Sequence, residues 1–164
     1  MAQVRTANVT WNGDLQTGSG MLNYVSSGVF SRLPITWASR TQEHSGKTSP
    51  EELVAAAHAS CFSMAFSARL AKNGTPATML DVRAEVNFDQ VDGAWKLTRS
   101  TLKVRGLVPG IDQATFDRIA EDARDNCPIS KALAGNVELA VETTLVDASA
   151  AASAEPRGWQ EGHS

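Results

Sequence analysis

Residues 49–74 form the segment that most constrains how this chain can fold. Ser49 is suited to be a helix N-cap, Pro50 to be the first helical residue, and Glu52 has the spacing of a capping box. Asn73–Gly74 at the other end is typical of a left-handed C-cap. Between these ends the segment is apolar, rich in alanine, and carries one thiol. We therefore predict a long helix that is buried against a close neighbour.

The rest of the chain reads as strands in hairpins with two further helices. Alternating and β-branched residues predict strands over 3–11, 14–26, 29–37, 80–91, 95–108 and 137–146, and apolar periodicity predicts helices over 113–125 and 129–134. Asn12–Gly13 and Asp92–Gly93 predict two-residue hairpin turns, and Asp112 predicts an N-cap. Consecutive strands favour an α+β fold with mainly antiparallel sheets. We expect one domain over residues 1–146 and a disordered, low-complexity tail over 147–164.

Charge and composition narrow the classes of function. The 164 residues carry a net charge of −3 with both signs interspersed, which gives no support for a nucleic-acid or anionic-membrane surface. No window approaches the roughly 18 apolar residues of a membrane span, and the N-terminus has no apolar signal-peptide core. We therefore expect a cytoplasmic protein without a membrane partner. In that reducing compartment, two cysteines are more often free or redox-active than a structural disulfide.

The two cysteines, Cys61 and Cys127, are the strongest candidates for chemistry. A metal site is poorly supported, because there is no Cys-x-x-Cys motif and no histidine at ligand spacing. Cys127 precedes Pro128 at a predicted helix start, where partial positive charge favours a thiolate. Cys61 lies in the middle of its helix, so its activation needs a nearby cation. Two inert, buried cysteines remain the alternative.

Nearby polar residues add little by themselves. Glu52 fits the helix cap and leaves Glu51 as a spare carboxylate, about 15 Å from Cys61 along a straight helix. Arg40, in a polar stretch before the helix, is more often a solvated charge than a catalytic group. His58 shares the helix face of Cys61 and is either a base or a hydrogen-bonded structural histidine. These residues alone support no more than a redox thiol protein.

The motifs around the two cysteines resemble a known family. Residues 50–65, Pro-Glu-Glu-Leu followed by Ala-Ala-His-Ala-Ser-Cys-Phe-Ser-Met-Ala, resemble the helix of the osmotically inducible protein C / organic hydroperoxide resistance family, in its osmotically inducible branch. Residues 108–117 and 127–130 resemble the second helix and the second cysteine of that family, and residues 11–14 also fit. The resemblance covers residues 4–146.

The resemblance implies both a fold and a reaction. Two chains would intertwine as a homodimer, with sheets wrapped around paired central helices. The chain would be a cysteine-based peroxidase for organic hydroperoxides, and less well for hydrogen peroxide, with Cys61 peroxidatic and Cys127 resolving. The activating pair maps onto Arg40 and Glu51; Arg32 is the alternative arginine, because the loop after Arg40 departs from the family pattern. An external dithiol, such as dihydrolipoamide or a lipoylated protein, would reduce the disulfide, with no metal, flavin or haem.

The spacing within the helix adds a prediction about assembly. If Glu51 serves Cys61 despite the offset of about 15 Å, it must come from the other chain. Small residues would let the two helices approach closely: Ala55, Ala56, Ala57, Ala59 and Ala65. Phe62, Met64 and Phe66 would either line an apolar substrate pocket or pack in the core. Two other functions stay open, a general thiol–disulfide oxidoreductase and a non-enzymatic dimer that binds an apolar ligand.

Overall fold

The structure, a computed structural model, describes residues 1–147. The chain divides into two compact units, which are described separately: residues 1–54 with 88–96, and residues 55–87 with those from 97 onward. The predicted tail lies outside the described residues after Asp147. The α+β class is confirmed, with two small three-stranded sheets and four helices among the described residues.

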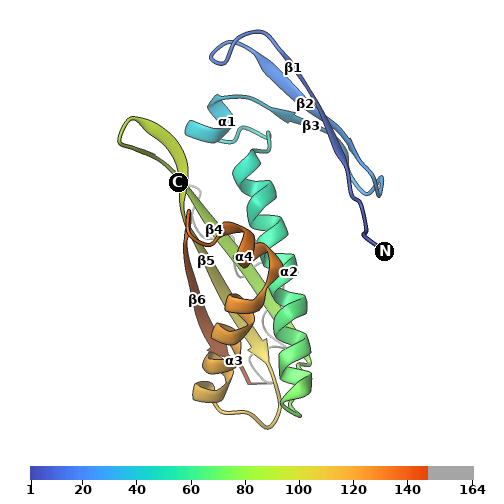
Figure 1. Ribbon diagram of the computed structural model, residues 1–164, viewed down its shortest axis with the longest axis vertical. Helices are drawn as coiled ribbons and strands as arrows, with labels where there is room; N and C mark the ends of the chain where they lie inside the picture. Colours follow the sequence, from blue (N-terminus) through green and yellow to red (C-terminus); the bar gives the residue numbers. More distant parts are fainter. Residues whose placement is uncertain (148–164) are drawn as a thin grey trace. The chain divides into compact units, whose positions relative to one another are not determined.

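The first unit contains a three-stranded antiparallel sheet. Its strands are β1 (Ala7–Asn12), β2 (Ser19–Val25) and β3 (Ser31–Ile35), paired in the order β1-β2-β3 (Figure 1). Pro34 lies in β3 at an edge of this sheet, as expected for a residue that cannot donate to a neighbouring strand.

The connection between β1 and β2 corrects one turn prediction. The predicted two-residue turn at Asn12–Gly13 is wrong, because Asn12 pairs with Ser19 and six residues join the strands. Asp14 explains the longer loop: its Oδ1 accepts the backbone N–H groups of Gln16 (2.8 Å) and Thr17 (2.9 Å). This side chain–backbone turn replaces a tight hairpin turn.

A short helix, α1 (Ala38–Thr41), occupies part of the stretch that was expected to be a polar loop. The buried Ser39 anchors it. Its hydroxyl lies 2.9 Å from the carbonyl oxygens of both Thr36 and Thr48, and its N–H donates to Thr36 Oγ1 at 3.1 Å. Arg40 therefore projects from a turn that is fixed on both sides.

The predicted long helix is α2 (Pro50–Lys72), which begins in the first unit and continues in the second. The Ser49 hydroxyl accepts the Glu52 N–H at 3.2 Å, which confirms the predicted N-cap. The capping box is not closed in the expected way, because the Glu52 carboxylate accepts the Thr48 hydroxyl at 2.9 Å instead. At the other end, Gly74 has the left-handed φ of +83° that the C-cap prediction requires.

The length and composition of α2 correct another expectation. This 23-residue helix is long and apolar enough to cross a membrane, whereas the sequence-based expectation is that no such window exists. One such helix is weak evidence for a membrane span, since core helices of soluble proteins meet the same criterion.

The second sheet has the order β4-β5-β6, with β4 (Met79–Val91), β5 (Ala94–Leu107) and β6 (Glu138–Leu145). Asp92 and Gly93 both have positive φ angles, 54° and 78°, as the predicted two-residue turn between β4 and β5 requires. β6 runs parallel to β5, because α3 (Gln113–Asn126) and α4 (Pro128–Leu133) form a crossover between them. Asp112 Oδ1 accepts the Thr115 N–H at 2.8 Å and confirms the predicted cap of α3.

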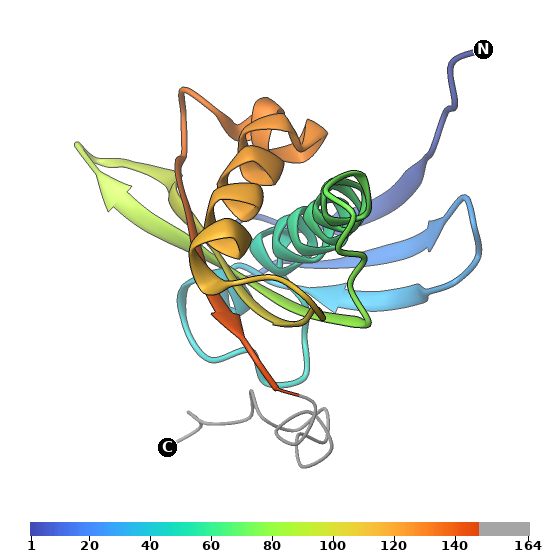
Figure 2. The same ribbon diagram turned by 90° about the horizontal axis from the view of Figure 1, so that it is seen from below.

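The core of the second unit lies between its helices and this sheet (Figure 2). α2, β5 and α3 supply most of its fully or nearly fully buried side chains: Phe62, Phe66, Leu70, Leu102, Val104, Phe116, Ile119, Ala120 and Ala123. Gly106 allows α3 to pack closely on β5, because a Cβ at that position would overlap the Phe116 ring. The predicted buried face of α3 is confirmed.

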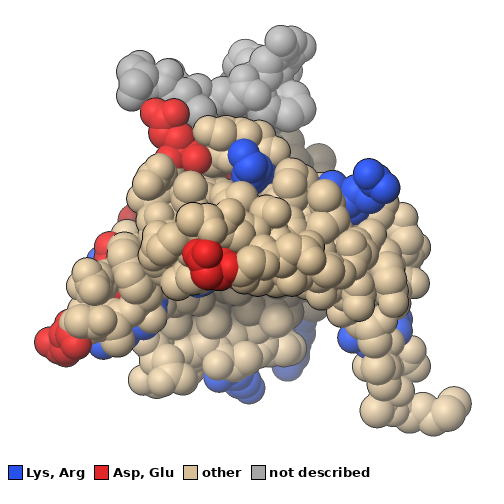
Figure 3. Space-filling model, turned by 90° about the horizontal axis from the view of Figure 1, so that it is seen from above, with Lys and Arg blue, Asp and Glu red and all other residues tan. Residues whose placement is uncertain are grey.

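Charged side chains are distributed as the sequence indicated. On the face drawn in Figure 3, basic and acidic side chains are scattered among uncharged ones. Several are paired with an opposite charge, as in the contacts of Arg69 with Asp122 and of Lys103 with Glu85.

Candidate active site

The two cysteines come together in the second unit. Cys61 lies in the middle of α2 and is partly exposed, whereas Cys127 is fully buried at the junction of α3 and α4. Both are free thiols, and they are close enough for each to perturb the pKa of the other. The structure therefore brings together two residues that are 66 positions apart in the sequence.

The environment of Cys61 does not activate it. Burial raises the pKa of the Cys61 thiol, and Cys127 raises it further; the backbone N–H of Ile129 has the opposite but weaker effect. No cation contributes to this shift among the described residues. The expectation that a mid-helix thiol needs a cation from elsewhere agrees with this direction.

Cys127 differs, because hydrogen-bond donors surround it. Burial opposes ionisation, but the backbone N–H and hydroxyl of Ser130, the Cys61 thiol and the Ile129 N–H together lower the pKa of Cys127. Cys127 is the N-cap residue of α4. The predicted position at a helix start is confirmed, and the donors there favour a thiolate.

His58, one turn before Cys61, is fully buried and hydrogen-bonded through both ring nitrogens. Nδ1 lies 2.8 Å from the Ser100 hydroxyl of β5, and Nε2 lies 2.8 Å from the Ser130 hydroxyl of α4. Burial lowers the pKa of His58, so the ring is neutral at pH 7. The hydrogen-bonded structural histidine, one of the two alternatives, is what the structure contains.

Arg40 and Glu51 form an ion pair within the first unit. Arg40 Nη2 lies 2.7 Å from Glu51 Oε1, and its Nε lies 3.2 and 3.3 Å from the two carboxylate oxygens. Glu51 is only 8% exposed. This fork-to-carboxylate geometry fixes the plane and direction of the guanidinium. The N–H groups that do not contact Glu51 can then donate to another group.

An aromatic cluster that sequence reasoning missed also holds Arg40. The guanidinium carbon lies 4.3 Å from the ring centre of Phe88 and 5.5 Å from that of Trp37. Phe88 stacks on Trp95 at 4.9 Å, and Trp37 meets both rings edge-on. The sequence signal was present: Phe88 and Trp95 flank the Asp92–Gly93 turn, where residues of the two strands face each other.

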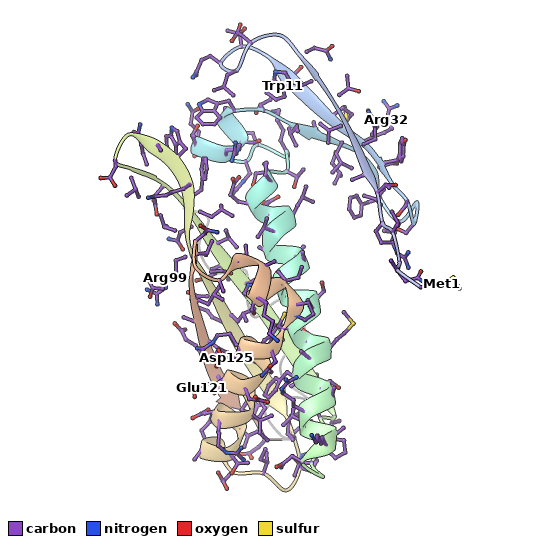
Figure 4. All side chains as sticks on the ribbon, viewed as in Figure 1. Met1, Trp11, Arg32, Arg99, Glu121 and Asp125 are labelled. Atoms are coloured by element: carbon purple, nitrogen blue, oxygen red, sulfur yellow. The ribbon has the colours of Figure 1, made fainter. Side chains whose placement is uncertain are left out.

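Arg32, the alternative arginine, has a different setting. It is exposed on β3, where Figure 4 labels it together with Trp11 of the same sheet. Its backbone has a φ of 58°, which is unusual for a side chain of this size. Among residues 1–147, Glu51 is paired with Arg40 and not with Arg32.

A cavity in the first unit lies beside Arg40. It measures about 360 Å³ and has mainly apolar walls. Its lining comes from β1, β3, the segments that follow these strands, α1 and the first residue of α2: Trp11, Leu15, Ile35, Thr36, Trp37, Arg40 and Pro50. Sequence reasoning placed the apolar pocket elsewhere.

Phe62 and Phe66 lie in the core, which favours core packing over the alternative of a substrate pocket. Each is fully buried, and Phe66 contacts both Phe62 and Phe116 in the core. Helical periodicity explains the outcome, because Phe62 and Phe66 are four residues apart and share the inner face of α2. Met64 points away from that face and is 68% exposed; its place in a substrate pocket stays a prediction.

The described residues contain no group of three or more His, Cys, Asp or Glu side chains arranged to hold a metal ion.

Comparisons with known proteins identify relatives of the chain. Residues 42–142 match the family model described as OsmC-like protein. The chain is 41% identical over 129 residues to "Peroxiredoxin OsmC" of Escherichia coli, which covers 79% of this chain and 89% of that protein. It is 36% identical over 105 residues to "Organic hydroperoxide resistance protein-like 1" of Staphylococcus saprophyticus, with coverages of 61% and 71%.

A solved structure is similar in fold. The crystal structure of the organic hydroperoxide resistance protein OhrB of Bacillus subtilis superposes with a TM-score of 0.64 at 27% identity. The match covers 85% of this chain and 98% of that one.

Proposed function

The chain belongs to the OsmC-like protein family, and from that premise we propose that it is a thiol-dependent peroxidase that reduces organic hydroperoxides, and hydrogen peroxide less well. The names of the relatives, a peroxiredoxin and organic hydroperoxide resistance proteins, support a peroxidase-like role. The single observation that carries the proposal is the contact between the two free thiols, one partly exposed and one buried.

The exposure of the two thiols suits the two roles. Cys61 as a thiolate attacks the terminal peroxide oxygen; an S–O bond forms, the O–O bond breaks, and the alkoxide takes up a proton to leave as the alcohol. Cys127 then attacks the sulfenic acid on Cys61, which gives a disulfide and water. An external dithiol, such as dihydrolipoamide or a lipoylated protein, returns both thiols. This cycle uses no metal, flavin or haem.

The pKa of Cys61 is raised, so the thiol needs a cation, and we propose that a second chain supplies it. Arg40 is the cation proposed to activate the thiol, and Glu51 holds it. Glu51 and Cys61 belong to one continuous helix, ten residues apart, so helix geometry puts about 15 Å between them along its axis. We therefore take the active site to be composite, with Arg40 and Glu51 of one chain serving Cys61 of another in a homodimer.

One face of α2 is suited to that dimer. Its exposed residues recur at helical spacing and are small except for a methionine: Ala57, Ser60, Met64, Ser67, Ala68 and Ala71. Ala57 belongs to the predicted seam as well, whereas Ala65 of that seam packs against the core instead. Small side chains let two helix backbones approach closely. A second copy of α2 is the proposed occupant of this face.

The cavity beside Arg40 supports an organic substrate. Its walls include Trp11 and Trp37, which offer apolar area to an alkyl or aromatic group, while Arg40 can bind the peroxide oxygens. Hydrogen peroxide has no organic group to bury there, which supports the preference for organic hydroperoxides.

The test compares the wild type with Cys61→Ser and Cys127→Ser in consuming cumene hydroperoxide, with dihydrolipoamide as reductant. Cys61→Ser should lose the activity. Cys127→Ser should react once and retain a sulfenic acid, detected by mass after dimedone trapping. Reduction of protein disulfides without peroxide consumption would instead support a general thiol–disulfide oxidoreductase. Peroxide consumption by Cys61→Ser at the wild-type rate would show that the proposal is wrong.

A further inference from the structure

A buried row of polar side chains leads from β5 to the resolving thiol. Ser100, His58 and Ser130 come from three different elements, and each is at most 1% exposed. Both His58 contacts measure 2.8 Å, and the Ser130 hydroxyl in turn donates toward the Cys127 sulfur. The proposed peroxidase cycle assigns no role to His58, Ser100 or Ser130.

The chemistry of imidazole imposes a direction on this row. A neutral ring has one N–H donor and one acceptor nitrogen, so its two hydroxyl partners cannot play the same part. When Cys127 is a thiolate, the Ser130 hydroxyl must donate to the sulfur, and its oxygen is then free to accept from His58 Nε2–H. Nδ1 is left as the acceptor for the Ser100 hydroxyl. Each group therefore donates toward Cys127.

Burial makes this order consequential. No described carboxylate or cation contacts the His58 ring, whose two nitrogens are both occupied by hydroxyls. In a site of low polarity, a row of hydrogen bonds in one direction polarises each successive donor. A hydroxyl that accepts from an imidazole N–H is a stronger donor to a thiolate than an isolated hydroxyl.

We propose that His58, held in one tautomer by Ser100, orients the Ser130 hydroxyl as a donor to the Cys127 sulfur and so favours the thiolate that resolves the sulfenic acid. His58 and Ser100 are positioning residues in this scheme, because they act through Ser130. The inference rests on the proposed function for its role in catalysis, but its structural content concerns Cys127 alone.

The step that this hydrogen bond accelerates is the formation of the disulfide between Cys127 and Cys61. The Cys127 thiolate attacks the sulfur of Cys61–SOH; the S–S bond forms, the S–O bond breaks, and hydroxide leaves and takes up a proton to become water. The Cys127 sulfur is oxidised and the Cys61 sulfur is reduced by the same amount, so no further oxidant enters. Speed matters here, because a sulfenic acid that is not resolved is open to irreversible over-oxidation.

The test uses the Cys61→Ser variant, in which Cys127 is the only thiol of the chain. The pKa of Cys127 is measured by NMR with [¹³Cβ]cysteine, which needs neither peroxide nor reductant. Ser130→Ala should raise this pKa, and Ser100→Ala should raise it less. Ser100→Ala is the decisive variant, because Ser100 forms a hydrogen bond with His58 and not with the Cys127 sulfur. Thr101→Val, which removes a buried hydroxyl from the next residue of β5, is the matched control and should leave the pKa unchanged.

Two further measurements separate a relay from simple packing. ¹⁵N NMR of the His58 ring should find the proton on Nε2 when Cys127 is ionised; a ring protonated on Nδ1 in that state would overturn the inference. His58→Phe should raise the Cys127 pKa, and His58→Gln, which keeps a donor and an acceptor, should restore it in part. If His58→Phe does not fold, the Ser100→Ala result stands alone: an unchanged Cys127 pKa overturns the inference.

The kinetic consequence is read in the protein with both cysteines. After one equivalent of hydroperoxide, Ser130→Ala should form the disulfide roughly tenfold more slowly at pH 7 for each unit by which the Cys127 pKa rises above neutrality. Oxidation of Cys61 should keep its wild-type rate. A failure of Cys61 to react with peroxide would refute the proposed function and leave the Cys127 titration valid.

Discussion

The surroundings of Arg40 and those of the two cysteines use opposite means to control a reactive group. Arg40 is held by a carboxylate and by aromatic ring faces, which keep a full charge in a fixed direction. Cys61 and Cys127 are influenced instead by backbone N–H groups, by each other and, for Cys127, by the Ser130 hydroxyl, which contacts the His58 imidazole; no full positive charge contributes among the described residues. The difference shows that Cys61 lacks, within its own unit, a cation that would favour its ionisation, whereas hydrogen-bond donors around Cys127 favour the thiolate of that residue.

Removing the cation is expected to have the largest effect. Arg40→Met keeps much of the apolar stem but deletes the guanidinium, so the peroxidase kcat/KM should fall by about 10²–10³, the usual loss for a donor that stabilises developing charge. Steady-state consumption of cumene hydroperoxide measures this. Arg32→Met is the control and should keep wild-type activity; the reverse result would make Arg32 the active-site arginine.

Mixing two inactive chains tests whether the cation comes from the partner. Co-expressed Arg40→Met and Cys61→Ser chains should recover about a quarter of the wild-type activity, because random pairing in a two-fold dimer yields that share of intact composite sites. Recovery is measured on the purified mixture, with each variant alone as the control. A mixture as inactive as its components would mean that Arg40 serves the thiol of its own chain or none.

Loosening the aromatic contact should have a smaller effect. Phe88→Leu preserves an apolar side chain but removes the ring face beneath Arg40, a contact generally worth about 0.5–2 kcal/mol. We expect kcat/KM to fall by roughly 2- to 30-fold, which is the rate equivalent of that energy. Tyr24→Phe, on β2, is a matched aromatic substitution that should change nothing. Equal activity of Phe88→Leu and the wild type would limit the cluster to a packing role.

The buried imidazole should give the smallest effect, which appears in stability. Burial lowers the pKa of His58 below its unfolded value, so the unfolded chain binds the extra proton first as the pH falls. The stability supported by neutral His58 is therefore present above pH 6.5 and lost progressively below it, by at most about 1.4 kcal/mol per pH unit. Urea unfolding between pH 5 and 8 measures this slope. His58→Gln should remove that part of the slope; an unchanged slope would contradict the assignment.

Local sequence signals were reliable where neighbouring residues decide the structure. The caps at Ser49 and Asp112 and the turn at Asp92–Gly93 form as predicted, because each depends on groups within a few residues of one another. The prediction of a two-residue turn at Asn12–Gly13 is wrong for an equally local reason. The nearby Asp14 carboxylate accepts the backbone N–H groups of Gln16 and Thr17 and so stabilises a longer loop.

The parts of the candidate site that could be predicted were those carried by residue type and spacing. The two thiols, Arg40 and Glu51 were singled out from the chain, and each ends in a setting with chemical consequences. The aromatic cluster around Arg40 was missed, because it joins α1 to the outer part of the β4–β5 hairpin, far away in the sequence.

The sequence by itself determined the α+β class and the long α2 helix with its caps, and it singled out the two cysteines as the candidates for chemistry. These follow from propensity, periodicity and residue chemistry, which act over a few residues. Only the tertiary structure decided that β6 pairs parallel to β5, that Phe62 and Phe66 belong to the core, and that His58 meets hydroxyls 42 and 72 residues away. Such contacts depend on how whole elements pack together. The local sequence of one element does not determine which side chains of distant elements will contact it.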